Sequence, residues 1–140
     1  MAGPYHPLDP LTANELKLCV QLLRDTGKIS PSIRFVSISL IEPYKAKILA
    51  NDVAPPFERS AKAVLLDRAK NETYEAVVKL APEQKVESYL LVPGVQPVIT
   101  LAEFAECEIA VRNSKEFIET LRKHYGKLLQ RFVIYSLCIT

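Results

Sequence analysis

Histidine, the side chain most often used to bind transition metals, is scarce in this sequence. The 140 residues contain two histidines, His6 and His124, which stand near opposite ends of the chain. No H-x-H or H-E-x-x-H pattern is present, and two histidines cannot supply a three-histidine metal site. We expect solvated, structural roles for both, because His6 lies in a proline-rich opening and His124 near the end of a predicted helix. The sequence therefore predicts no metal-binding residues.

The cysteines and glycines give no sign of a nucleophile or a phosphate site. Cys19, Cys107 and Cys138 are odd in number and widely spaced, so we expect reduced thiols. Cys19 and Cys107 fall within apolar helical patterns, where a thiol acts as a small hydrophobe, and no histidine is placed by sequence to activate Cys107. Glycine occurs only at positions 3, 27, 94 and 126, which excludes a glycine-rich phosphate loop and a G-x-S-x-G elbow.

Carboxylates are plentiful, but their spacing favours solvated surfaces. Glu103, Glu106 and Glu108 are expected on an exposed helix face. Asp67, Glu72 and Glu75 are expected on the exposed edge of a hairpin, with Tyr74 as an ordinary aromatic residue at the start of a strand. An acid–base pair needs a concave apolar setting that the pattern does not provide. We therefore predict no catalytic and no cofactor-binding residues in this chain.

A helix that could cover a sheet is predicted near the start of the chain. Thr12 and Glu15 form a T-x-x-E capping box, which satisfies free N–H groups at a helix start. Gly27 stands where a left-handed C-terminal cap is needed. Between them lies one apolar stripe with helical spacing: Leu16, Cys19, Val20 and Leu23, widened by Leu18 and Leu22.

After residue 27 the apolar period changes to that of strands. The first predicted strand alternates Val36, Ile38 and Leu40 with serines, and residues 46–49 are expected to resume it beyond Pro43. Residues 63–67 and 74–80 form a predicted hairpin with Asn71 in the turn, and residues 85–92 form a last strand with Val86, Leu90 and Val92 on one face. The fold class is therefore α+β, with one helix packed on about four antiparallel strands.

Two prolines and a glycine in residues 92–97 interrupt both helix and strand, so we expect a boundary there. Beyond it, Thr100 with Glu103 and Asn113 with Glu116 predict the starts of two short helices. Their apolar stripes are Phe104, Cys107 and Val111, then Phe117, Leu121 and Tyr125, with Gly126 as a stop. The predicted organisation is a domain over 1–92, a linker over 93–97, a helical segment over 98–126 and an apolar, strand-prone tail over 127–140.

Composition excludes several classes of protein. The net charge of +2 is small and mixed in sign, which gives no footprint for nucleic acid or an anionic membrane. No stretch is long and apolar enough to span a bilayer. The opening residues lack the basic start and apolar region of a signal peptide, so we expect an intracellular protein, cytoplasmic or peroxisomal.

Four short sequence motifs resemble those of the copper amine oxidases, and they occur in the same order within residues 5–125. They are HPLDPLT at 6–12, FVSISL at 35–40, LDRAKNETYEA at 66–76 and VPGVQP at 92–97. They are similar to the two small N-terminal domains that precede the catalytic domain of that family. The resemblance implies a cystatin-like helix on a curled antiparallel sheet over the first domain, followed by the helical start of a second similar domain.

The resemblance also implies what the parent enzyme does: a homodimer with copper and topaquinone oxidises primary amines to aldehydes, ammonia and hydrogen peroxide. None of that machinery maps onto this chain, because no Asn-Tyr pair of the quinone motif occurs and two histidines cannot replace three copper ligands. We expect a non-catalytic N-terminal portion that packs on the catalytic domain. The alternative is an independent cystatin-like protein-interaction module. Residues 127–140 do not resemble the family, and we expect them to derive from a truncated or mis-spliced reading frame.

Overall fold

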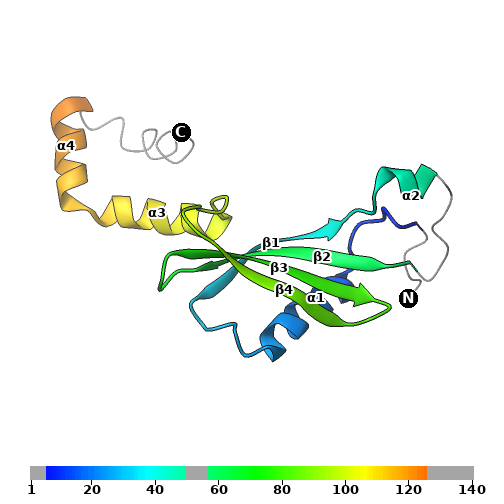
Figure 1. Ribbon diagram of the computed structural model, residues 1–140. Helices are drawn as coiled ribbons and strands as arrows, with labels where there is room; N and C mark the ends of the chain where they lie inside the picture. The colour runs from blue at the N-terminus through cyan, green and yellow to red at the C-terminus, as the bar shows by residue number, and fades with distance from the viewer. Residues whose placement is uncertain (1–5, 50–56, 126–140) are drawn as a thin grey trace. The chain divides into compact units, whose positions relative to one another are not determined.

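The computed structural model describes residues 6–49 and 57–125 (Figure 1). The chain divides into two compact units, Met1–Pro97 and Val98–Thr140, and each is considered by itself. The first unit contains helix α1 (Ala13–Asp25), strands β1 (Ile33–Ile41), β2 (Arg59–Asp67), β3 (Glu72–Ala81) and β4 (Lys85–Val92), and the short helix α2 (Lys45–Leu49). The second contains helices α3 (Leu101–Asn113) and α4 (Lys115–Tyr125).

Helix α1 begins and ends where local chemistry predicts. The Thr12 hydroxyl accepts a hydrogen bond from the Glu15 N–H at 3.2 Å, and the Glu15 carboxylate accepts one from the Thr12 N–H at 2.8 Å. Gly27 follows the helix with φ of +71°, a left-handed conformation that costs glycine little. The predicted capping box and glycine stop are both confirmed.

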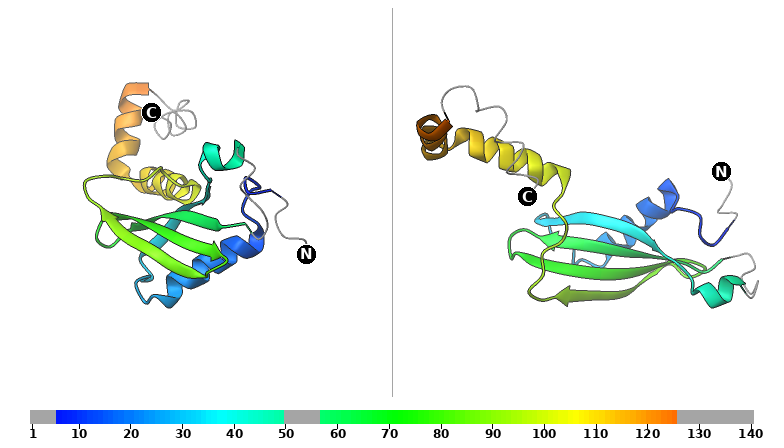
Figure 2. Two further views of the ribbon diagram at one scale, coloured as in Figure 1. Left: turned by 45° about the vertical axis from the view of Figure 1, so that its right-hand side comes forward. Right: turned by 90° about the horizontal axis from the view of Figure 1, so that it is seen from above.

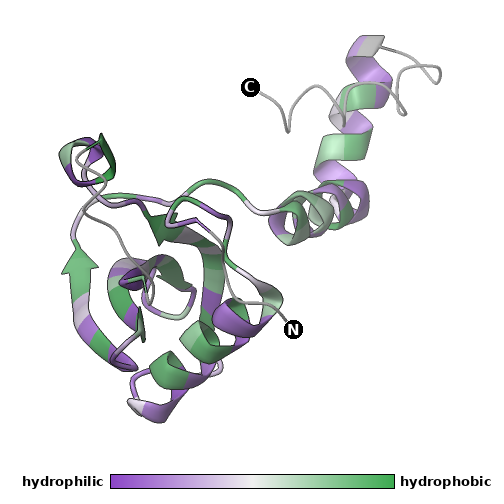
Figure 3. Cartoon of the chain, turned by 90° about the vertical axis from the view of Figure 1, so that its right-hand side faces the viewer, coloured by the Kyte–Doolittle hydropathy of each residue, from purple (hydrophilic) through white to green (hydrophobic). Residues whose placement is uncertain are grey.

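The four strands form one antiparallel sheet in the order β1-β2-β3-β4, and α1 lies across one face (Figure 2). The apolar side of α1 faces the apolar stretches of the strands (Figure 3). Three of the core residues that the sheet contributes are alanines, whose small side chains leave room for α1. The buried core cluster consists of Cys19, Leu23, Ala61, Ala63, Leu65, Ala76, Val78 and Leu80. The α+β prediction is confirmed, although the sheet is not strongly curled.

Two β-bulges correct the predicted faces of the edge strands. In β1 the register shifts between Phe35 and Ser37, so Phe35 packs against the core where Val36 was predicted. In β4, Val77 pairs with Ser88 but Val78 pairs with Val86, which leaves one extra residue between them. An extra residue reverses the inward and outward alternation. As a result Tyr89 packs against the core, whereas Leu90, predicted to share a face with Val86, is 63% exposed.

The prediction that residues 46–49 resume a strand is wrong, because they belong to helix α2. The Tyr44 carbonyl accepts hydrogen bonds from the Lys47 and Ile48 N–H groups, at 2.9 and 3.4 Å. This segment of lysine, alanine, isoleucine and leucine contains good helix formers, and Pro43 removes the ladder donor that a continuing strand would need. The prolines at 55 and 56 lie outside the described residues.

In the second unit, the Thr100–Glu103 capping box is confirmed at the start of α3. The second predicted cap is off by one residue: Ser114, not Asn113, accepts the hydrogen bond from the Phe117 N–H, at 3.3 Å. Leu121 is buried, but no residue of α3 is. The predicted stop at residue 126 and the apolar tail at 127–140 lie outside the described residues. Among the helices of the described ranges, none is long and apolar enough to cross a membrane.

Candidate functional site

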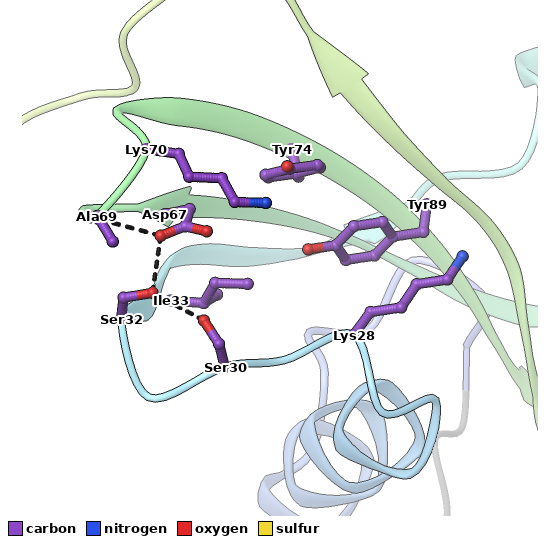
Figure 4. A pocket seen from close by; sticks show the side chains of 9 residues that line it. All are labelled: Lys28, Ser30, Ser32, Ile33, Asp67, Ala69, Lys70, Tyr74 and Tyr89. Atoms are coloured by element: carbon purple, nitrogen blue, oxygen red, sulfur yellow. Dashed lines mark hydrogen bonds between the residues drawn. The ribbon is translucent and has the colours of Figure 1, made fainter.

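The first unit has a pocket of about 360 Å³ where the loop after α1 meets the turn between β2 and β3 (Figure 4). Local sequence explains the turn, because Asn71 adopts φ of +56°, a conformation that asparagine tolerates better than most residues. The sheet contributes two tyrosines and the loop contributes hydroxyl groups. The residues that line the pocket are Lys28, Ser30, Ser32, Ile33, Asp67, Ala69, Lys70, Tyr74 and Tyr89.

Asp67 is 4% exposed, which corrects the prediction that it lies on an exposed edge. Its Oδ1 accepts hydrogen bonds from the Ser32 hydroxyl at 2.7 Å and from the Ala69 N–H at 3.0 Å. The Ser30 and Ser32 hydroxyls are 2.7 Å apart, and because Ser32 donates to the carboxylate, Ser30 must donate to Ser32. The hydrogen bond from Ser32 holds the pKa of Asp67 below its ordinary value. A carboxylate so held is a poor general base near neutral pH.

The two tyrosines form the aromatic wall of the pocket. Their ring centroids are 5.0 Å apart with a 32° tilt, and the Lys28 ammonium lies 5.3 Å from the centroid of Tyr89. Tyr74 donates its hydroxyl to Glu72 Oε2 at 2.6 Å, and this hydrogen bond raises the pKa of Tyr74 to about 12. Burial raises the pKa of Tyr89 as well. Both phenols therefore keep their protons at neutral pH.

The side chains of this pocket connect the loop after α1 to the β2–β3 turn, and their protonation states favour this structural role over a catalytic one. The carboxylate stays ionised, the phenols stay protonated, and Asp67 already accepts hydrogen bonds from Ser32 and from the turn at Ala69. Sequence reasoning placed Asp67, Glu72 and Tyr74 in one hairpin but missed Ser30 and Ser32. The distance of 35 residues between Ser32 and Asp67 is what hides their contact from local patterns. That no residue of this chain is catalytic stays a prediction.

A second polar cluster, which the sequence did not reveal, surrounds Arg59 at the start of β2. Arg59 is 2% exposed, and its guanidinium forms a bidentate ion pair with Glu15, Nε to Oε1 at 2.6 Å and Nη2 to Oε2 at 3.1 Å. The remaining N–H groups donate to main-chain carbonyls: Nη1 to Pro7 and Asp9 at 3.2 and 3.0 Å, and Nη2 to Pro10 at 3.2 Å. All five donors of the guanidinium are thus used.

The Arg59 cluster explains the structural role of the HPLDPLT motif at residues 6–12. Three carbonyls of residues 7–10 converge on one buried cation, so this proline-rich opening is held against α1 and β2. Burial raises the pKa of Glu15, but the hydrogen bonds from Arg59 and Thr12 outweigh it, so the pKa lies below the ordinary value. The cluster stabilises the fold and leaves no N–H free for a ligand.

The other predicted candidates lie apart from both clusters. The exposed His6 accepts a hydrogen bond from the Leu8 N–H at its Nδ1, which is a turn contact, and His124 is an exposed residue of the other unit. Burial raises the pKa of the Cys19 thiol to about 11, while Cys107 is exposed and Cys138 lies outside the described residues. Within the described ranges no group of three or more His, Cys, Asp or Glu side chains could hold a metal. These residues do not fit the copper ion of the amine oxidases.

Comparison with known proteins confirms the resemblance. The AGAO-like N2 domain family matches residues 12–89. A primary amine oxidase of Arthrobacter sp. (strain P1) is 40% identical over 123 residues, which cover 88% of this chain and 18% of the relative. A primary amine oxidase of Klebsiella aerogenes is 34% identical over 85% of this chain and 16% of its own length. A peroxisomal copper-containing diamine oxidase of Nicotiana tabacum is 30% identical over 87% of this chain and 20% of its own length.

The family match begins at the capping residue of α1 and ends in β4, so it covers the helix and sheet of the first unit. The chain spans about one fifth or less of the length of these curated relatives. The chain belongs to the AGAO-like N2 domain family, the N-terminal domain portion of copper amine oxidases.

Proposed function

We propose that this chain is the non-catalytic N-terminal portion of a copper- and quinone-dependent primary-amine oxidase. In the parent reaction a primary amine, oxygen and water give an aldehyde, ammonia and hydrogen peroxide. The first unit is the first small cystatin-like domain, residues 93–97 are the linker, and α3 and α4 are the helical part of the second. Their role is to pack on the catalytic domain of a homodimeric enzyme, in the cytoplasm or the peroxisome.

The observation that carries this proposal is the family match over residues 12–89 together with 40% identity to a primary amine oxidase over 88% of this chain. Exposed apolar side chains support a packing role. Leu101 at the start of α3 is 88% exposed, and Ile109 on the same helix is also exposed. Exposed apolar side chains that gather on one element are typical of surfaces that contact another protein segment.

A stand-alone protein-interaction module is the second candidate, and one observation favours it. The first unit has its own buried core, and no buried side-chain nitrogen or oxygen among the described residues lacks a hydrogen-bond partner. A domain with a complete core could act by itself. The two candidates differ in the exposed surface that they leave without a partner.

The test is to purify the chain, incubate it with copper and a primary amine, and measure peroxide and the quinone absorbance. We expect neither signal, and amine-dependent peroxide would overturn the proposal. Binding of the dye ANS separates the two candidates. A packing portion deprived of its partner binds ANS strongly, whereas a stable monomer that binds no ANS supports the independent module.

A further inference from the structure

We propose that residues 93–97 form an anchored strap, which fixes the point at which the chain leaves the first unit. After β4 the chain turns at Gly94, whose φ is +71°. The Val95 carbonyl then accepts a hydrogen bond from the Thr73 hydroxyl at 2.8 Å, and the Gln96 Nε2 donates to Asn71 Oδ1 at 2.8 Å. This inference is independent of the catalytic or non-catalytic role of the parent protein.

The anchor at Thr73 is buried, which gives it energetic weight. Thr73 is 4% exposed although it lies near the start of β3, where the sheet ends. Release of Val95 would leave a buried hydroxyl without its acceptor, and an unpaired buried polar group is costly. The hydrogen bond therefore favours the docked position of the strap over a free one.

The second anchor depends on the shape of the β2–β3 turn. Asn71 has φ of +56°, and its side-chain amide accepts the hydrogen bond from Gln96. The two partners of the strap thus lie close together in the chain, Asn71 in the β2–β3 turn and Thr73 near the start of β3, 25 and 22 residues before Gln96 and Val95. The LDRAKNETYEA and VPGVQP motifs, which carry part of the family resemblance, are therefore joined to each other by these two hydrogen bonds.

Pro93 and Pro97 complete the strap, because each fixes its own φ and the glycine between them supplies the turn. A linker of this kind differs from a flexible glycine–serine tether, which samples many end positions. The exit point of the chain at Pro97 is defined by the first unit. Any segment that follows therefore starts from a set position, which lowers the entropic cost of its binding elsewhere.

The experiment is ¹⁵N relaxation of the full chain, read at the Val95 and Gln96 amides. We expect order parameters close to the value of about 0.85 that is typical of a rigid backbone. The variant Thr73→Val keeps the shape of the side chain but removes the donor, and Gln96→Ala removes the second anchor. In the double variant we expect values below about 0.6, which is typical of flexible backbone.

Gln84→Ala, in the exposed turn between β3 and β4, is the matched control and should leave the strap rigid. Chemical shifts of the core residues show whether each variant is folded. If Thr73→Val unfolds, Gln96→Ala alone still tests the strap, since it removes an exposed contact. Flexible Val95 and Gln96 amides in the wild-type chain would overturn the proposal, as would a double variant that keeps wild-type order.

Discussion

Replacement of Arg59 by lysine tests whether the buried guanidinium holds the opening of the chain against α1 and β2. Arginine donates five hydrogen bonds here, two to Glu15 and three to the carbonyls of residues 7–10. A lysine ammonium has three donors at a single point and cannot reproduce a planar fork. At least two acceptors are then left without a partner.

The expected loss follows from those contacts. Most of these contacts are only part-buried, so the cost of each acceptor left unpaired lies in the lower part of the usual range, at about 1–2 kcal/mol. With two such acceptors, Arg59→Lys should lower the free energy of unfolding by about 2–4 kcal/mol. Arg59→Met should cost about 3–5 kcal/mol, because it leaves the Glu15 carboxylate without its cation. Arg24→Lys is the matched control, since Arg24 is exposed in the last turn of α1, and its effect should stay within about 0.5 kcal/mol.

The assay is urea unfolding of the full chain, followed by circular dichroism. The double variant Arg59→Met/Glu15→Leu adds an internal check, because its loss should be smaller than the sum of the two single losses if the side chains form one pair. An Arg59→Lys protein as stable as the Arg24→Lys control would refute the reasoning. So would strictly additive losses at Arg59 and Glu15.

Three further predictions concern pH, thiol reactivity and helix caps. The pKa of Glu15 is depressed in the folded state, so the stability that Glu15 contributes is present above its unfolded pKa and is lost as the pH falls through the folded pKa. Glu15→Gln should therefore reduce the dependence of the urea unfolding midpoint on acid pH. An unchanged pH dependence would contradict this prediction. Burial raises the pKa of the Cys19 thiol to about 11, so iodoacetamide at neutral pH should label the exposed Cys107 at least tenfold faster than Cys19. Peptide mass spectrometry measures the two labelling rates, and equal rates would show that Cys19 is accessible. Thr12→Ala should lower the free energy of unfolding in urea by about 1 kcal/mol, because it removes the capping hydroxyl of α1. Thr12→Ser keeps a hydroxyl and should retain most of that stability. Equal losses in both variants would exclude the cap as the cause.

Local signals predicted the parts of the fold that depend on local chemistry. The Thr12–Glu15 box, the glycine at position 27 and the Asn71 turn all lie where the sequence indicated, because each depends on residues a few positions apart. The hairpin and the last strand were also predictable, since alternation and turn residues define them. The motifs that resemble the copper amine oxidases lie in this same helix-and-sheet region.

The missed burial of Arg59 and of Asp67 has a common cause, which is contact between segments distant in the sequence. Arg59 lies in a strand whose alternation points it inward, but the inward charge is tolerable because Glu15 and the folded-back carbonyls of residues 7–10 pair with it. Asp67 is buried because Ser32 reaches it from another loop. Tyr89 replaces Leu90 on the inner face because a bulge shifts β4, and bulges have no reliable local pattern.

We propose above that this chain is an N-terminal portion that packs on the catalytic domain of an amine oxidase. The most direct measurement is titration calorimetry of the full chain against the separately produced catalytic portion of the Arthrobacter relative, to which this chain is 40% identical. We predict saturable binding, weakened at least tenfold by Leu101→Lys/Ile109→Lys and unchanged by the exposed control Lys17→Ala. The absence of binding by a correctly folded wild-type chain would contradict the proposed packing role.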